Sequence, residues 1–106
     1  MDLVTEVYRA TATFPDHEKF GIAAKLHKAA VSLSSSIAEG QKQSTVGELE
    51  QFLGHARGSL FEVATQVKIA ENLGLITEEK HQNLHELIDE VGRLLDGLSS
   101  SLSNDK

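Results

Sequence analysis

The sequence contains no cysteine and no tryptophan, and only one of its 106 residues is proline. The lack of cysteine excludes disulfide bonds, a thiolate nucleophile and a cysteine-based zinc site. No run of apolar residues approaches the roughly 20 that are needed to cross a bilayer. The first residues, MDLVTEVYRA, also lack the basic and apolar regions of a signal peptide. We therefore expect a cytoplasmic protein that does not contact a membrane.

Positive charge is also scarce, because 10 lysines and arginines stand against 16 aspartates and glutamates. The excess lies in residues 44–106, which hold five basic and eleven acidic side chains, whereas residues 1–43 hold five of each. Phosphate backbones are bound by basic side chains that displace counterions, so this balance disfavours nucleic acid as a partner. RNA or DNA binding stays open as an alternative through four lysines near the second predicted helix, Lys19, Lys25, Lys28 and Lys42.

Turn and capping residues divide the chain into four predicted helices, at about residues 2–13, 17–39, 45–73 and 77–100. The single proline ends the first helix, and Asp16 is the expected N-cap of the second. Thr45 and Glu48 have the spacing of a capping box, and Thr77 precedes two glutamates in the first turn of the fourth helix. No segment alternates with the period of a strand. The sequence therefore predicts one all-α domain, an antiparallel up-down-up-down four-helix bundle.

The predicted third helix is apolar on two opposite sides. One side runs from Leu49 to Ala70 at three- and four-residue intervals and, with a leucine stripe of the fourth helix, forms the expected core. The other side carries Gly54, Gly58, Phe61, Thr65 and Ile69. Glycine in a helix interior costs roughly 0.5 to 1 kcal/mol relative to alanine, so this pair of glycines predicts the close approach of another backbone. Either both sides pack inside one subunit, or the second side contacts another subunit.

The second predicted helix contains the serine-rich stretch SLSSSIAEG at positions 32–40. Serine is a mediocre helix former, and Glu39 places an anion at the negative end of the helix dipole. Small hydroxyl side chains let a neighbouring backbone come near, and donors from outside the helix would stabilise the carboxylate. We expect Glu39, Arg57 and Glu62 to hold the second and third helices, or two subunits, in register. The alternative is that all three are solvated surface charges.

A set of short motifs follows in order through most of the chain. They are Phe14-Pro15-x-x-Glu18-x-x-Gly21, Ala29-Ala30-Val31-Ser32, Ile37-Ala38-Glu39-Gly40, Phe52-Leu53 and Ala56-Arg57-Gly58-Ser59-Leu60-x-Glu62. With them the chain resembles the four-helix bundle family first noticed as reading frames within intervening sequences of bacterial large-subunit (23S) ribosomal RNA genes. This family is related to the accessory protein of diversity-generating retroelements. The resemblance implies a ring-like homopentamer without an established enzymatic activity, and nucleic-acid binding in the basic retroelement branch.

The chain departs from the family pattern at positions that can bind anions. Ser36 stands where an asparagine is common, and Lys28 stands where an arginine often precedes the alanine pair. Gln41 and Gln43 partly replace a basic residue that is frequent after the Ala-Glu-Gly segment. Each change weakens arginine-type recognition of phosphate or carboxylate groups. The nucleic-acid role of the basic branch is therefore not the first expectation for this chain.

One candidate metal site lies on the fourth predicted helix, at His81, His85 and Asp89. Two histidines at i and i+4 can chelate a transition metal, but the catalytic glutamate of a His-Glu-x-x-His motif is missing. A metal-dependent nucleotide hydrolase needs carboxylate pairs on two helices, and only Glu86 and Asp89 form such a pair. We therefore expect no metal, no cofactor and no catalytic residue.

These observations favour a non-enzymatic, homo-oligomeric scaffold or adaptor, a homopentamer by resemblance. A nucleic-acid-binding accessory protein is the first alternative, and a metal-dependent nucleotide hydrolase is the second. The expected partners are further copies of the chain and a protein that spans the ring. The expected subunit interface is the stripe of Gly54, Gly58, Phe61 and Ile69.

Overall fold

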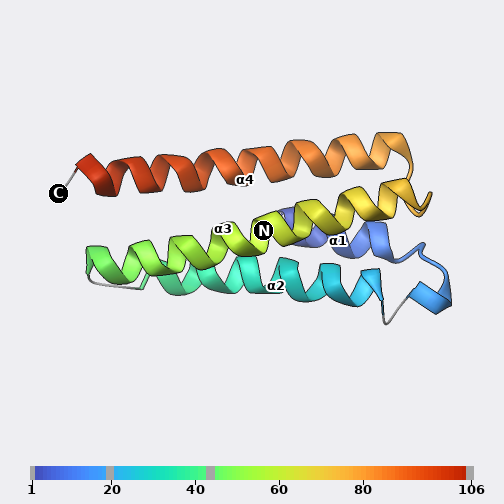
Figure 1. Cartoon of the computed structure of the whole chain (residues 1–106), viewed down its shortest axis with the longest axis horizontal. Helices are drawn as coiled ribbons and strands as arrows, with labels where there is room; N and C mark the ends of the chain where they lie inside the picture. Colours follow the sequence, from blue (N-terminus) through green and yellow to red (C-terminus); the bar gives the residue numbers. More distant parts are fainter. Residues whose placement is uncertain (1, 19–20, 43–44, 105–106) are drawn as a thin grey trace.

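The computed structural model of the protein describes residues 2–18, 21–42 and 45–104, with side chains described up to residue 101. This part of the chain contains no strand, and its helices are α1 (Asp2–Thr11), η1 (Asp16–Glu18, a 3₁₀ helix), α2 (Ile22–Gly40), α3 (Val46–Asn72) and α4 (Glu78–Asn104). The four α-helices lie lengthwise side by side in an elongated bundle of 48 × 23 × 18 Å (Figure 1). The predicted all-α fold with four helices is therefore confirmed.

The long helix α3 begins and ends where the sequence predicts. Thr45 is its N-cap, and the Thr45 Oγ1 accepts a hydrogen bond of 3.1 Å from the Glu48 N–H. At the other end Gly74 adopts a φ of +74°, and the N–H groups of Gly74 and Leu75 donate to carbonyls in the last turn of α3. This arrangement is a Schellman motif, which favours glycine at the left-handed position. Local capping chemistry therefore sets both ends of the helix.

The start of the second helix differs from the predicted range of 17–39. Asp16–Glu18 forms a 3₁₀ turn, closed by a hydrogen bond of 2.9 Å from the Glu18 N–H to the Pro15 carbonyl. α2 begins at Ile22, and its N-cap is Gly21, which makes no side-chain cap, so the expected capping by Asp16 is wrong. The proline fixes φ before the turn and the glycine weakens a helix after it, which favours a short tight turn between them. The other helix ends agree with the prediction to within about one turn.

The core lies between the helices and includes side chains from all four. The largest fully buried side chains among the described residues are Leu3 and Val7 of α1, Leu33 of α2, Val63 and Val67 of α3, and Leu84 and Leu95 of α4. Residues at three- and four-residue intervals share one side of a helix, which explains how each helix contributes a stripe. None of the described helices has the length and apolar character that crossing a membrane requires.

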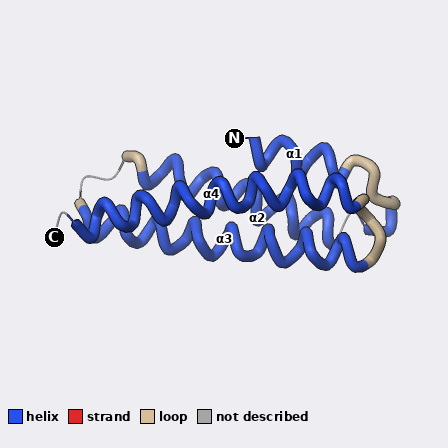
Figure 2. The backbone as a smooth tube through the Cα atoms, turned by 90° about the horizontal axis from the view of Figure 1, so that it is seen from above, coloured by secondary structure: helices blue, strands red, loops and turns tan. Residues whose placement is uncertain are grey.

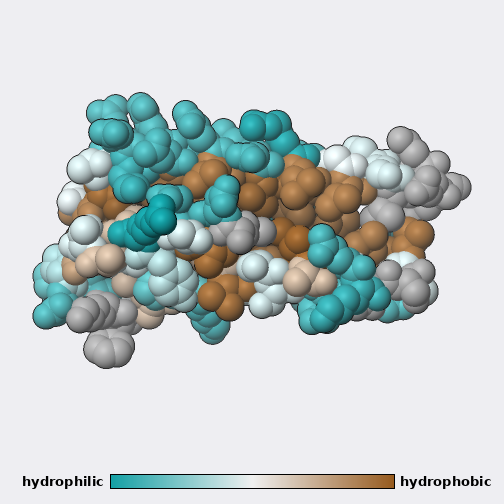
Figure 3. All heavy atoms as spheres, turned by 180° about the vertical axis from the view of Figure 1, so that it is seen from behind, coloured by the Kyte–Doolittle hydropathy of each residue, from teal (hydrophilic) through white to brown (hydrophobic). Residues whose placement is uncertain are grey.

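The short helix α1 covers only part of the bundle, since it has 10 residues and α4 has 27. At 1.5 Å per residue, α1 is about 15 Å long beside a helix of about 40 Å. Figure 2 shows that α1 begins near the middle of the bundle. Figure 3 shows apolar surface beside the part of α4 that α1 does not cover. This surface holds a cavity of about 290 Å³, lined by residues that include Ile37, Leu49, Phe52, Leu94 and Leu98. One half of the bundle therefore has four helices and the other half has three.

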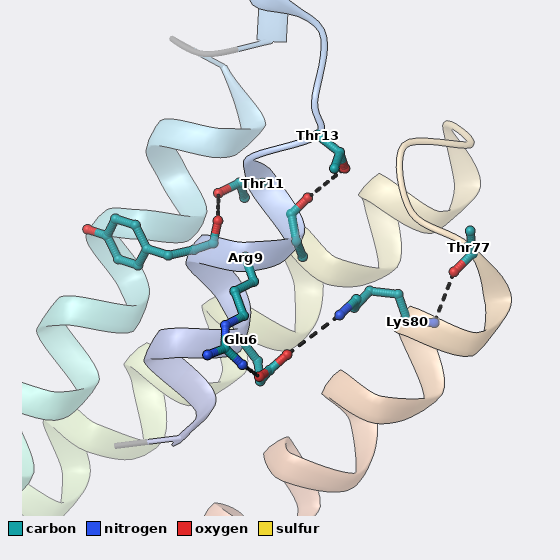
Figure 4. Close-up of polar contacts among 8 residues, drawn as sticks. Glu6, Arg9, Thr11, Thr13, Thr77 and Lys80 are labelled. Atoms are coloured by element: carbon teal, nitrogen blue, oxygen red, sulfur yellow. Dashed lines mark hydrogen bonds and ion pairs between the residues drawn. The ribbon is translucent and has the colours of Figure 1, made fainter.

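An ion pair joins α1 to the start of α4 (Figure 4). The Glu6 carboxylate lies 2.8 Å from the Arg9 guanidinium on the same helix and 3.5 Å from the Lys80 ammonium of α4. The Lys80 N–H donates a hydrogen bond of 3.1 Å to the Thr77 Oγ1, so Thr77 caps α4 as the sequence predicts. The position of α1 along the bundle is thus held by charge as well as by its buried side.

Candidate functional site

A groove of about 720 Å³ runs along the surface between α2 and α3. Small residues line much of it, Ala29 and Ser32 from α2 and Gly54, Gly58 and Ser59 from α3. The hydroxyl oxygens of Ser32 and Ser59 lie 2.9 Å apart, and either hydroxyl can donate to the other. This contact gives a physical reason for one of the serines of α2, because a short hydroxyl side chain satisfies its polar group against the next helix.

Packing inside the described part of the chain does not explain Gly54 and Gly58 of α3. A β-carbon added at Gly54 or Gly58 would meet no described atom within 4 Å, whereas one added at Gly40 would lie 3.3 Å from the Leu49 side chain. The close approach predicted at Gly54 and Gly58 therefore does not occur within the described part of one subunit. Since glycine weakens a helix, the open space above this pair is a feature that the fold of one chain does not require.

The second apolar stripe of α3 faces solvent beside the groove. Phe61 is 75% exposed, Ile69 is 39% exposed, and Thr65 between them is also exposed. On α2, Val31 lies on the outer side of the helix and is 46% exposed. The alternative in which both stripes pack inside one subunit is therefore wrong for these residues. A surface that combines open glycines with an exposed phenylalanine is a candidate interaction site.

Arg57 joins α3 to α4 and not to α2. Its Nη1 donates a hydrogen bond of 2.7 Å to the Asp96 carboxylate, and its Nη2 donates one of 3.1 Å to the Ser99 hydroxyl. Within the chain, the predicted contact of Arg57 with Glu39 and Glu62 is therefore wrong. The physical reason is the direction of the side chain, since Arg57 lies on the side of its helix that faces α4.

The two carboxylates of the predicted network have other contacts. The Glu62 carboxylate accepts a hydrogen bond of 2.9 Å from the Gln66 amide one turn later on α3. The Glu39 carboxylate lies 3.7 Å from the Lys42 ammonium just beyond the end of α2. That these residues hold two subunits in register stays a prediction, because the structure contains a single chain.

Two of the lysines that the sequence offers as nucleic-acid contacts line the groove. Lys25 and Lys28 are exposed there, close to the carboxylate-bearing residue Glu62. Neither lysine forms an ion pair within the described part of the chain, whereas Lys42 pairs with a carboxylate three residues earlier. Lys19 lies outside the described residues. The groove therefore combines small residues with two cations that have no partner among residues 2–18, 21–42 and 45–104.

The histidines of α4 contact carboxylates in separate pairs. The His81 Nδ1 lies 2.5 Å from the Glu71 carboxylate of α3, and the His85 Nε2 lies 3.4 Å from the Asp89 carboxylate. Among the described residues, no group of three histidine, aspartate or glutamate side chains is placed to hold a metal ion. The candidate metal site at His81, His85 and Asp89 is therefore not assembled, and Glu86 with Asp89 has no third ligand beside it in the described part of the chain.

His27 forms a contact between α1 and α2 that sequence reasoning did not find. Its ring stacks on Tyr8 with the centroids 4.0 Å apart, and its Nε2 lies 2.6 Å from the Oγ1 of Thr11, which is buried. Burial lowers the pKa of His27 below its ordinary value, because the charged ring loses hydration. Spacing rules apply within one helix, so they carry no signal for two residues that are 16 positions apart.

The chain matches the family model described as 23S rRNA-intervening sequence protein over residues 1–97. This range includes all of α1, α2 and α3 and most of α4. No curated protein matches the chain. The match confirms the resemblance that the ordered motifs carry.

Proposed function

We propose that this chain, which belongs to the family of 23S rRNA-intervening sequence proteins, is a non-enzymatic scaffold that assembles from antiparallel up-down-up-down bundles into a homo-oligomer. The observation that carries the proposal is the outer side of α3, where Gly54 and Gly58 leave open space and Phe61 is 75% exposed. Contiguous apolar surface of this kind marks interaction sites, and exposed aromatic side chains commonly act as their anchors.

A second copy of the chain is the favoured partner, because most soluble oligomers are symmetric assemblies of one chain. The half of the bundle that α1 leaves uncovered supplies another exposed apolar surface, where Leu94 is 53% exposed. Two different surfaces that fit each other form a head-to-tail contact, and such a contact closes into a ring when its rotation allows. A homopentamer repeats each surface five times, so a protein that spans several subunits binds with avidity.

The contacts of charged side chains between helices support the non-enzymatic part of the proposal. The Arg57 guanidinium contacts the Asp96 carboxylate, and the His81 ring contacts the Glu71 carboxylate, so both contacts join α3 to α4. Side chains engaged in such pairs position helices relative to each other.

The exposed groove is lined mainly by small residues and lysines, with His55 and Glu62 among the other lining residues. The Glu62 carboxylate accepts a hydrogen bond from Gln66, and no contact between Glu62 and His55 is seen among the described residues, so the groove lacks an oriented acid–base pair there.

Light scattering on the purified chain tests the proposal. We expect a mass near five times the 11.5 kDa of one chain. Phe61→Asp places a charge on the exposed stripe, and Gly58→Leu fills the open space, so each variant should lower the mass without loss of helicity in circular dichroism. Val46→Asp introduces the same charge at an exposed position of α3 outside the stripe and should keep the wild-type mass. A wild-type single chain would contradict the proposal.

Nucleic-acid binding is the alternative, favoured by the two groove lysines that are unpaired among the described residues. Fluorescence anisotropy with labelled RNA and DNA at low salt, repeated as salt increases, distinguishes it from the scaffold. Binding that falls steeply with salt and weakens when Lys25 and Lys28 are both changed to alanine would favour this alternative. Lack of binding at low salt would exclude it.

A further inference from the structure

The described lysines and arginines form ion pairs within the chain, with three exceptions. Arg9, Lys42, Arg57, Lys68 and Lys80 each lie within 4.0 Å of a carboxylate. The three without such a partner among the described residues are Lys25 and Lys28 in the groove, and Arg93 on α4. Within the described part of one chain, the two lysines of the groove and Arg93 of α4 therefore have no ion-pair partner.

The exposed side of α4 carries the charges that complement the groove. Glu86, Glu90 and Arg93 follow at intervals of four and three residues, so they share one side of the helix, and all three are exposed. Neither glutamate forms an ion pair within the described part of the chain, whereas the aspartates on the flank toward α3 have partners. Gly97 continues this side, and a β-carbon added there would meet no atom of the described residues within 4 Å.

We propose that the groove between α2 and α3 binds the exposed side of α4 from a second copy of the chain. This inference rests on the proposed homo-oligomer and names the two surfaces that meet in it. Lys25 and Lys28 of one copy pair with Glu86 and Glu90 of the next. The contact is head-to-tail, because each copy supplies the groove at one end of the contact and α4 at the other.

The spacing of the charges fits this arrangement. Lys25 and Lys28 are about 4.5 Å apart along α2, and Glu86 and Glu90 are about 6 Å apart along α4, at 1.5 Å per residue. Lysine and glutamate side chains are long and flexible enough to bridge this difference, so both pairs form together. One turn further along α4, Arg93 then approaches Glu62, the one acidic residue among those lining the groove.

Small residues on both surfaces let the two helices come close. Gly54 and Gly58 lie in the groove and Gly97 lies on α4, each with open space where a β-carbon would stand. Helix axes pack 8 to 10 Å apart depending on the side chains between them, and glycine gives the shorter separations. Phe61, beside the groove, is then covered by the neighbouring α4, where Leu94 is 53% exposed. The apolar contact supplies affinity, and the charges select the occupant and its register.

Charge reversal tests the proposal in the full chain. One variant carries Lys25→Glu with Lys28→Glu, and another carries Glu86→Lys with Glu90→Lys. Each brings like charges together at the contact, so light scattering should show the mass falling from the wild-type value toward that of one chain. The quadruple variant combines all four changes and restores opposite charges, so its mass should return to the wild-type value.

A matched control places the same charge change elsewhere on α4. Glu78 lies in a surface cavity with Glu71 and His81, and Asp89 pairs with His85, so both lie outside the proposed contact. The variant Glu78→Lys with Asp89→Lys should keep the wild-type mass. Circular dichroism on every variant shows whether a change of mass reflects a loss of helical structure.

The outcomes separate this inference from the proposed function. A wild-type single chain overturns both. A wild-type oligomer that survives both double reversals, or that the quadruple variant fails to restore, overturns the inference and leaves the homo-oligomer in place. The inference also fails if reversal of Lys25 and Lys28 leaves the mass unchanged but abolishes binding of a fluorescein-labelled single-stranded RNA, because the groove then binds a polyanion.

Discussion

On the side of α3 that faces the core, Val63 and Val67 are almost fully buried, whereas on the opposite side Phe61 is 75% exposed and Ile69 is 39% exposed. Both sides follow helical spacing, so the spacing alone does not distinguish the stripe that is buried from the stripe that is exposed. The difference lies in the neighbours, since the other helices of the bundle bury one stripe and leave Phe61 and Ile69 of the other exposed. Periodicity therefore identifies the sides that carry apolar residues, and the bundle geometry determines which of them one chain buries.

The largest expected contrast is between a core leucine and the exposed phenylalanine of this helix. Leu53→Ala removes buried methyl groups and leaves a cavity, so the free energy of unfolding should fall by about 2 to 5 kcal/mol. Phe61→Ala removes more atoms, but they are exposed, so the change for the dissociated chain should stay within about 0.5 kcal/mol. Urea unfolding of dilute samples, followed by circular dichroism, measures both values. Equal losses would show that Phe61 packs inside its own subunit.

A smaller contrast is expected between two glycines of the same region. Gly74 has a φ of +74°, so Gly74→Ala strains the end of α3 and should lower the free energy of unfolding by about 1 to 2 kcal/mol. Gly58→Ala meets nothing within 4 Å and restricts the unfolded chain, so it should raise the free energy of unfolding by about 0.4 to 1 kcal/mol. Thermal and urea unfolding of the dissociated chain both report these changes.

The mass of the same Gly58→Ala variant in light scattering tests whether a neighbouring subunit contacts this side of α3. If a neighbouring subunit approaches α3 at this position, the added methyl group weakens assembly while it stabilises the single chain. A variant that is less stable as a single chain would instead mean that part of the same chain already occupies the space above Gly58. If the exposed stripe is a subunit interface, Gly58→Ala should therefore raise the free energy of unfolding of the single chain and lower the mass of the assembly.

The helix ends that could be predicted are those that local chemistry decides. The threonine caps and the Schellman glycine act through hydrogen bonds to residues within one turn, so Thr45, Gly74 and Thr77 are visible in the sequence. At the start of α2 two local signals compete. A cap at Asp16 favours a helix from residue 17 by about 1 kcal/mol, whereas Gly21 costs a helix interior about the same amount. The structure has a 3₁₀ turn at Asp16–Glu18 and a new helix from Ile22, and weighing the two signals from the sequence alone does not give this outcome.

The candidate site was predictable only in part, for a related reason. The stripe that contains Gly54, Gly58 and Phe61 follows from helical spacing, because spacing fixes how side chains on one helix lie relative to each other. The partner of a charged residue depends on how helices pack, which spacing does not describe. The hydrogen bond of Arg57 to Asp96, 39 positions away, is therefore not visible in the sequence. The same holds for the contact of His27 with Thr11.

The smallest expected effect concerns pH and compares a packed and an exposed surface. His27 packs between α1 and α2, whereas Ser32 lines the exposed groove of α2 and α3. Burial lowers the pKa of His27 from its ordinary value of 6.5, so the unfolded chain binds a proton at a higher pH than the folded chain does. The stability that neutral His27 provides is therefore fully present above pH 6.5 and is lost as the pH falls toward the folded pKa.

We expect the free energy of unfolding to decrease as the pH falls below 6.5, and His27→Gln to make this decrease shallower. Ser32→Ala removes no titrating group and should leave the slope unchanged, which makes it the control. Urea midpoints measured at a series of pH values give the slope for each variant. A slope that His27→Gln does not alter would mean that the ring is solvated and that α1 is held by Glu6 and the core alone. Equal flattening by Ser32→Ala would show that the slope does not report the protonation of His27.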